Sequence, residues 1–190
     1  MNRSFLLTLT LAVLLSGCTT VVHKVTRDPI EPAPTRTSLG TSIDDFQIET
    51  LIGVNIKKAH PDLEEANVNV HSYNGVILLT GQVPTEELRA TAGRVAREFR
   101  GVRLAHNELQ TGPNSTFGSR SSDSWLGTKI RTRLIAEKDL DSGAIKVIVE
   151  DGSVFLMGIV EPEQADRAAT LASRIRGVER VVKAFEYLNP

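Results

Sequence analysis

Three residues spaced four apart carry the clearest chemistry in this chain: Trp125, Lys129 and Arg133. At about 100° per residue in an α-helix they share one flank, with Trp125 about 140° from the middle of the apolar stripe. A Trp ring favours the headgroup level of a membrane, and each nearby cation adds ~1 kcal/mol at an anionic surface. The spacing therefore predicts a membrane-interface site that binds anionic phospholipid.

The predicted lipid-contact set also includes neighbouring residues of the same helix. It consists of Trp125, Leu126, Lys129, Arg131, Arg133 and Leu134. Three cations and one Trp would bind weakly alone, but a membrane anchor elsewhere in the chain would raise their effective concentration. The alternative is that Trp125 packs beneath a linker or against the other half of the chain.

An anchor is predicted at the N-terminus. Phe5 to Leu15 is an apolar run of eleven residues, too short to span a bilayer and typical of a secretory signal. It ends in Leu15-Ser16-Gly17-Cys18, which resembles a bacterial lipobox; the resemblance implies cleavage after residue 17 and fatty acylation, such as palmitate, on Cys18. Thr19 in place of Asp implies outer-membrane delivery under the enteric sorting rule. The alternative is an ordinary secreted protein with a chance cysteine.

Composition argues against several other functions. Without residues 1–17 the chain keeps 21 of its 22 basic residues against 23 acidic ones, so no nucleic-acid partner is expected. The single Cys leaves no disulfide and no Cys-based metal site. The four histidines are scattered, without metal-ligand spacing. We see no nucleophile–base constellation and no phosphate-binding glycine motif, and so expect no catalytic residue, no metal and no cofactor.

A stretch of ten residues occurs twice, which indicates two copies of one small domain. Residues 74–83 return as 151–160, and Gly101-Val102 returns as Gly177-Val178. Two Pro- or Gly-rich segments, 18–42 and 111–121, read as a flexible tether and a linker loop. The predicted domains are therefore 43–110 and 122–190.

Each copy predicts the order α-β-β-α-β. Apolar residues at helical spacing mark the first helices: Ile48, Ile52 and Ile56, then Leu126, Ile130 and Leu134. Asp44 and Asp45, or Asp123, are expected to cap these helices. Asn74-Gly75 and Asp151-Gly152 predict type I′ hairpin turns.

The remaining elements follow the same logic. The second helices are expected after Thr85 and at Pro162, with Gly101 and Gly177 as their C′ glycines. The final strands should run 102–109 and 178–188, parallel to the second strand of each hairpin. The fold class is therefore α+β, with two helices on one face of a three-stranded mixed sheet in each domain.

The uncovered face of the second sheet would carry Phe155, Met157 and Ile159. Such an exposed apolar patch needs a partner, and we expect the first domain to pack there. The alternative is a binding site for another protein.

The repeated motifs resemble the BON domain, a bacterial periplasmic and outer-membrane module. Residues 75–83 and 152–160 carry the resemblance, each followed by an Ala-rich helix and a Gly-Val pair. Together with the lipobox and tether, the architecture is similar to dual-BON outer-membrane lipoproteins. That resemblance implies a non-enzymatic, lipid-anchored protein on the periplasmic face, binding anionic phospholipid and supporting outer-membrane integrity, notably at division sites. The alternative is an adaptor for an envelope protein, such as an assembly machine or a regulator of cell-wall amidases.

Each copy serves as a control for the other, because shared residues are needed by both folds. The first copy has Gln47, Leu51 and Asn55 where the second has the Trp-centred cluster. It also has Asp44, Asp45 and Glu49 on a helix where the second copy has three cations. This difference predicts that the second domain, rather than the first, contacts lipid.

Overall fold

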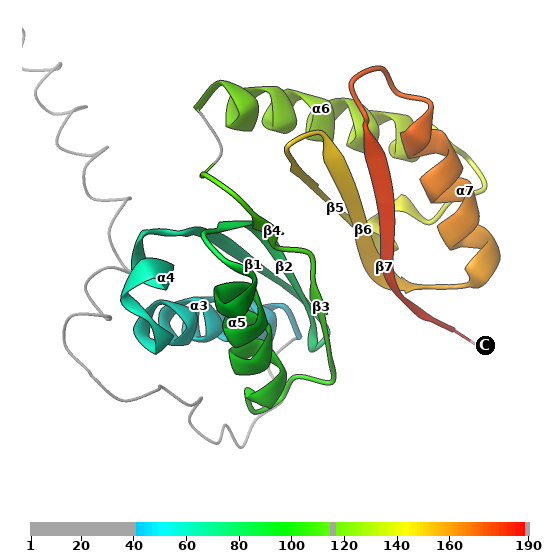
Figure 1. Cartoon of the computed structure of the whole chain (residues 1–190). Coiled ribbons are helices and arrows are strands. Elements are labelled where there is room, and N and C mark those ends of the chain that lie inside the picture. Colours follow the sequence, from blue (N-terminus) through cyan, green and yellow to red (C-terminus); the bar gives the residue numbers. More distant parts are fainter. Residues whose placement is uncertain (1–40, 115–116, 189–190) are drawn as a thin grey trace, which may run out of the picture.

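The computed structural model describes residues 41–114 and 117–188 (Figure 1). The predicted signal segment, Cys18 and the tether up to residue 40 lie outside this part of the chain. The elements of the first domain are α3 (Thr41–Ala59), α4 (Pro61–Glu65), β1 (Asn67–Tyr73), β2 (Val76–Val83), α5 (Glu86–Glu98), β3 (Leu104–Asn107) and β4 (Gln110–Thr111). Those of the second are α6 (Phe117–Ile135), the 3-10 turn η1 (Ser142–Ala144), β5 (Ile145–Glu150), β6 (Ser153–Val160), α7 (Pro162–Ser173) and β7 (Arg180–Tyr187).

Both sheets have the predicted mixed topology. In the first, β2 pairs with β1 antiparallel and with β3 and β4 parallel. In the second, β6 pairs with β5 antiparallel and with β7 parallel. The expected third strand of the first domain is divided into β3 and β4, whereas β7 is continuous. The α+β fold with two similar domains is confirmed.

The hairpin turns have the backbone conformation that their sequences predict. Asn74 and Gly75 have φ values of 50° and 74°, and Asp151 and Gly152 have 45° and 70°. Positive φ at both central positions is the requirement of a type I′ turn, which suits Asn-Gly and Asp-Gly.

Each domain has its own core between its helices and its sheet. The buried residues that the helical stripes predicted, Ile52 and Ile56 in α3 and Leu126, Ile130 and Leu134 in α6, belong to these cores. The second helices contribute mainly alanines, such as Ala165, Ala168 and Ala172. Small side chains let α7 lie close to the sheet, so a domain of this size can still exclude water.

A third apolar cluster joins the two domains through their sheets. Its buried members are Val76, Leu78, Ile148, Phe155, Met157 and Ala184. Phe155 and Met157 are 1% and 0% exposed, so this part of the face expected to need a partner is covered by the first domain, whereas Ile159 is half-buried at its margin. The helices of the two domains lie on the outer sides of the two sheets (Figure 1). The predicted packing of one copy on the other is thus confirmed.

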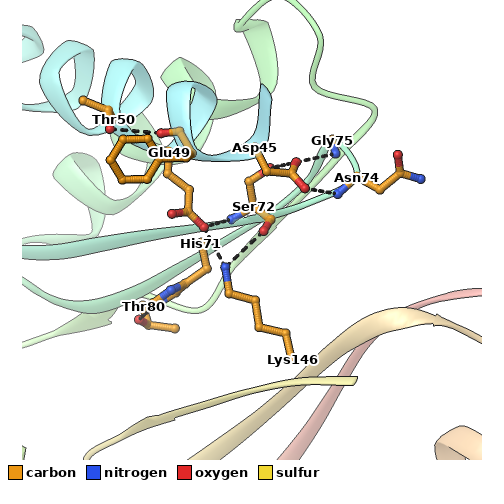
Figure 2. A network of polar contacts seen from close by, with 10 residues as sticks. Asp45, Glu49, Thr50, His71, Ser72, Asn74, Gly75, Thr80 and Lys146 are labelled. Carbon is orange, nitrogen blue, oxygen red and sulfur yellow. Dashed lines mark hydrogen bonds and ion pairs between the residues drawn. The ribbon is translucent and has the colours of Figure 1, made fainter. Parts of the chain in front are cut away.

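Polar contacts frame this apolar interface. The Lys146 ammonium of the second domain lies 2.7 Å from a Glu49 carboxylate oxygen and donates to the Ser72 carbonyl at 3.1 Å (Figure 2). Arg103 pairs with Glu186, and Arg180 with Glu108. Because these pairs come from several elements, they fix the register of one sheet on the other.

Two local predictions need correction. The helix of the second domain begins at Phe117, inside the segment expected to be a linker loop up to residue 121. Gly101 and Gly177 do not occupy the C′ position: α5 and α7 end at Glu98 and Ser173, and the glycines lie in the following turns at φ 93° and 103°. A search of the described residues finds no helix with the length and apolarity needed to cross a membrane.

Candidate membrane-contact site

The predicted site lies on α6, the outer helix of the second domain. Leu126, Ile130 and Leu134 face the sheet and are at most 5% exposed. This stripe fixes the rotation of the helix, so the residues between its members must point away from the core. The rotation matches the one that the sequence predicts.

Trp125 is 63% exposed, an unusual position for the largest apolar side chain in the chain. The Lys129 ammonium lies 4.2 Å from the centre of its ring. A cation at this distance is attracted by the ring face, by ~0.5–1 kcal/mol at an exposed site. The predicted Trp–Lys pair is therefore formed at the surface, and the alternative of a buried Trp125 does not hold among the described residues.

The sequence interpretation missed a second exposed apolar residue on the same face. Ile135 is 71% exposed and ends α6. Ten residues after Trp125, it lies about 15 Å further along the axis and about 80° around it. A helical-wheel projection that included the last turn of α6 would have predicted that Ile135 is exposed.

Two threonines between these apolar residues are less polar than their type suggests. The Thr128 hydroxyl donates to the Ser124 carbonyl at 3.0 Å, and the Thr132 hydroxyl donates to the Thr128 carbonyl at 2.9 Å. Because both hydroxyls are satisfied within the helix, they need no water as an acceptor. We call Trp125, Thr128, Thr132 and Ile135 the outer face of α6.

The two arginines of the predicted set lie on different flanks of this face. Arg133 is exposed on the flank of Lys129. Arg131 is exposed on the other flank, where its guanidinium donates to the Val147 carbonyl of β5 at 2.8 Å. Cations thus border the outer face on both sides, although one of them is partly engaged with the protein.

Leu126 and Leu134 are not contact residues. They are 5% and 2% exposed and belong to the core of the second domain. Their place in the predicted contact set is corrected, because the stripe that packs on the sheet cannot also reach a membrane. Their role is to hold α6 in the rotation that exposes Trp125.

Asp123 ties the start of this site to the hairpin of its own domain. Its carboxylate accepts hydrogen bonds from the backbone N–H groups of Asp151 at 2.8 Å and Gly152 at 3.0 Å. Asp45 does the same for Asn74 and Gly75 in the first domain (Figure 2). The expectation that these acids cap their helices is wrong: Asp45 and Asp123 lie inside helices and cap turns. The side chain of Asp44 lies outside the described residues.

The first domain presents a different surface at equivalent positions. Leu51 packs against the core and Asn55 is 7% exposed. Phe46 is 69% exposed on α3, but it is next to Asp45, and Glu49 follows one turn later. Acidic neighbours oppose an anionic surface, whereas the outer face of α6 combines exposed apolar groups with cations.

Comparison with protein families shows the family to which the chain belongs. The BON domain model matches residues 44–113 and 122–189, which cover most of the chain and coincide with the two folded units. The chain belongs to the BON family. Its two BON domains are the two copies that the repeat predicts, joined through their sheets.

Similar proteins in other bacteria extend the likeness beyond the domains. The outer membrane lipoprotein DolP of Haemophilus influenzae is 38% identical over 184 residues, 93% of this chain and 92% of DolP. A 21 kDa hemolysin of Actinobacillus pleuropneumoniae is 39% identical over 161 residues, 85% of this chain and 81% of the relative. Osmotically-inducible protein Y of Escherichia coli is 26% identical over 145 residues, 73% and 72% of the two chains.

These matches show a DolP-like protein with two BON domains. They also place it in the bacterial envelope, associated with the outer membrane. The outer face of α6 lies in the second BON domain.

Proposed function

We propose that the second BON domain binds anionic phospholipid through the outer face of α6, and that Cys18 carries a lipid anchor on the periplasmic face of the outer membrane. The protein acts without catalysis, as a membrane-bound support of outer-membrane integrity, including at sites of division. The observation that carries this proposal is the exposure of Trp125 beside the Lys129 ammonium.

The physical argument rests on the composition of this face. Trp125 and Ile135 supply apolar area that gains from the membrane interface, and Lys129, Arg131 and Arg133 supply attraction to anionic headgroups. The anchor would keep the domain close to the membrane, so that a weak contact is enough to orient it.

The structure weakens the alternative that the protein is an adaptor for another envelope protein. The apolar sheet that could have received a partner protein, centred on Phe155 and Met157, is buried between the two domains. A protein partner would have to use another surface of the molecule.

Vesicle co-sedimentation tests the proposal. The mature chain, residues 18–190 with Cys18→Ser, lacks the signal segment and cannot carry a thioether-linked lipid. It is mixed with phosphatidylcholine vesicles with and without phosphatidylglycerol. Trp125→Glu with Lys129→Glu should weaken binding to the anionic vesicles more than about tenfold, because it removes the Trp and reverses one cation worth ~1 kcal/mol.

The matched control is Gln47→Glu with Lys57→Glu on α3, which changes the net charge by the same amount. It should leave binding within about twofold, since that helix is not the contact. Equal loss of vesicle binding in both double variants would show that the interaction depends only on net charge. Absence of binding by the unsubstituted chain would favour the adaptor.

A further inference from the structure

A surface depression of about 1060 Å³ lies beside Trp125, between α6 and two turns of the second domain. Trp125 and Lys129 line it from α6, and Arg176 and Glu179 line it from the turn between α7 and β7. Its lining includes the charged side chains of Lys129, Arg176 and Glu179, which suit a polar headgroup.

The turn that carries Arg176 packs directly on α6. A Cβ added at Gly177 would lie 3.7 Å from Leu126 Cδ1, an ordinary van der Waals distance, so the turn lies beside the helix. The Glu179 backbone N–H donates to the Gly152 carbonyl at 3.0 Å, which joins the same turn to the hairpin. Arg176 and Glu179 are therefore held at a defined place next to the outer face of α6.

Some of the charged side chains that line the depression already have hydrogen-bond partners. The carboxylates of Asp123 and Asp151 already accept hydrogen bonds, from the backbone of the hairpin and from Gln82. Within the described part of the chain, neither Arg176 nor the Glu179 side chain has a hydrogen-bond or ion-pair partner. Two cations, Lys129 and Arg176, and one carboxylate, Glu179, remain to meet a ligand.

The first domain uses the equivalent place differently. Arg103 stands where the second domain has Glu179, and its guanidinium donates to the Asn74 carbonyl at 2.7 Å and pairs with Glu186 of the other domain. Leu51 stands where the second domain has Lys129. In the first copy this position joins the domains, whereas in the second it is left open to solvent.

We propose that the depression holds the headgroup of one phospholipid. Lys129 and Arg176 bind the phosphate oxygens, and Glu179 accepts a hydrogen bond from a hydroxyl of the headgroup alcohol. This inference rests on the proposed membrane contact of α6, and it adds a specificity that net charge alone does not give. The site should prefer phosphatidylglycerol to phosphatidylmethanol, which has the same charge but no headgroup hydroxyl.

The test measures binding of residues 18–190 with Cys18→Ser to vesicles that contain either anionic lipid in phosphatidylcholine. One hydrogen bond to a partly exposed carboxylate, worth ~1 kcal/mol, predicts about a fivefold preference for phosphatidylglycerol. Glu179→Met should abolish this preference. Bulk charge cancels in the ratio, since both lipids carry one negative charge.

Arg176→Gln should weaken binding to both lipids about fivefold more than Arg174→Gln, a control that removes the same charge two residues earlier, outside the depression. Thermal melting confirms that the variants fold. Equal affinity for the two lipids, or equal effects of the two arginine variants, would overturn the headgroup site while leaving membrane contact intact. Loss of all anionic binding in the unsubstituted chain would instead overturn the proposed function itself.

Discussion

At the scale of single residues, Asp45 and Asp123 occupy equivalent positions on the first helix of each domain and hold the hairpin turn of that domain. Sequence reasoning found the residues but assigned them to helix capping, because a turn partner about 28 positions away leaves no local signal. The pairing is visible only once the helix lies across the hairpin.

Asp123→Ala should therefore destabilise the protein by about 1–3 kcal/mol, because two backbone N–H groups in a half-buried turn lose their acceptor. Chemical denaturation measures the change. Asp139→Ala, at an exposed position of the same domain, should cost under about 0.5 kcal/mol. A loss for Asp123→Ala no larger than that of the control would contradict the assigned role.

At the scale of elements, periodicity predicted most of the fold. The stripes of α3 and α6, both hairpins and the two faces of each sheet follow from apolar spacing and turn chemistry, and the structure confirms them. The start of α6 at Phe117 was missed because Gly118 and the serines that follow it are weak helix formers, so composition predicted a loop there. Arg176 was missed because a turn residue has no periodic signal.

Gly81 allows the backbones of β1 and β2 to approach closely near the start of β1. Its φ is 112°, and an added Cβ would lie 1.9 Å from the Asn67 carbonyl oxygen. Gly158 meets the Ala144 carbonyl oxygen in the same way at 2.1 Å. Gly81→Ala should cost at least ~2 kcal/mol, since the partner is backbone and cannot move aside.

Gly53→Ala is the matched control in α3, where an added Cβ would meet only Val70 Cγ2 at 3.8 Å. It should be neutral or stabilise by about 0.5–1 kcal/mol, as Ala replaces Gly inside a helix. The denaturant midpoints of Gly81→Ala and Gly53→Ala measure this difference in stability. Similar midpoints would show that the close approach at Gly81 is not required.

At the scale of the whole molecule, the junction of the two domains buries a titratable group. Desolvation, and then the Lys146 charge, lower the pKa of His71 from 6.5 to about 4, while the Glu49 charge raises it. His71 also contacts the Thr80 hydroxyl at 3.3 Å (Figure 2). A depressed pKa means that the folded state disfavours the protonated ring, so stability is lost as pH falls from about 6.5 to 4.

Glu150, in the same junction, has the opposite effect on the pH dependence of stability. Burial raises its pKa, so protonation favours the folded state, and its contribution offsets part of the loss at low pH. The difference between the native chain and His71→Gln isolates the histidine. The variant should lose less stability between pH 6.5 and 4 in denaturation experiments. Parallel curves for His71→Gln and the native chain would contradict this.

The arrangement of the two domains determines which surfaces are left exposed. One face of each sheet joins the domains and the other packs on helices, so the outer helices and the turns remain at the surface. The helix of the first domain carries Asp45 and Glu49, which serve a turn and the interdomain Lys146 contact. The helix of the second domain is free to carry the Trp-centred outer face.

The fluorescence of Trp125 tests the central claim most directly, because it is the only tryptophan in the chain. Starting from 63% exposure, its emission should shift to shorter wavelength when phosphatidylglycerol vesicles are added to the Cys18→Ser chain. Phospholipids brominated near the headgroup should then quench it. Emission that keeps its wavelength and is not quenched by these vesicles would contradict membrane contact through α6.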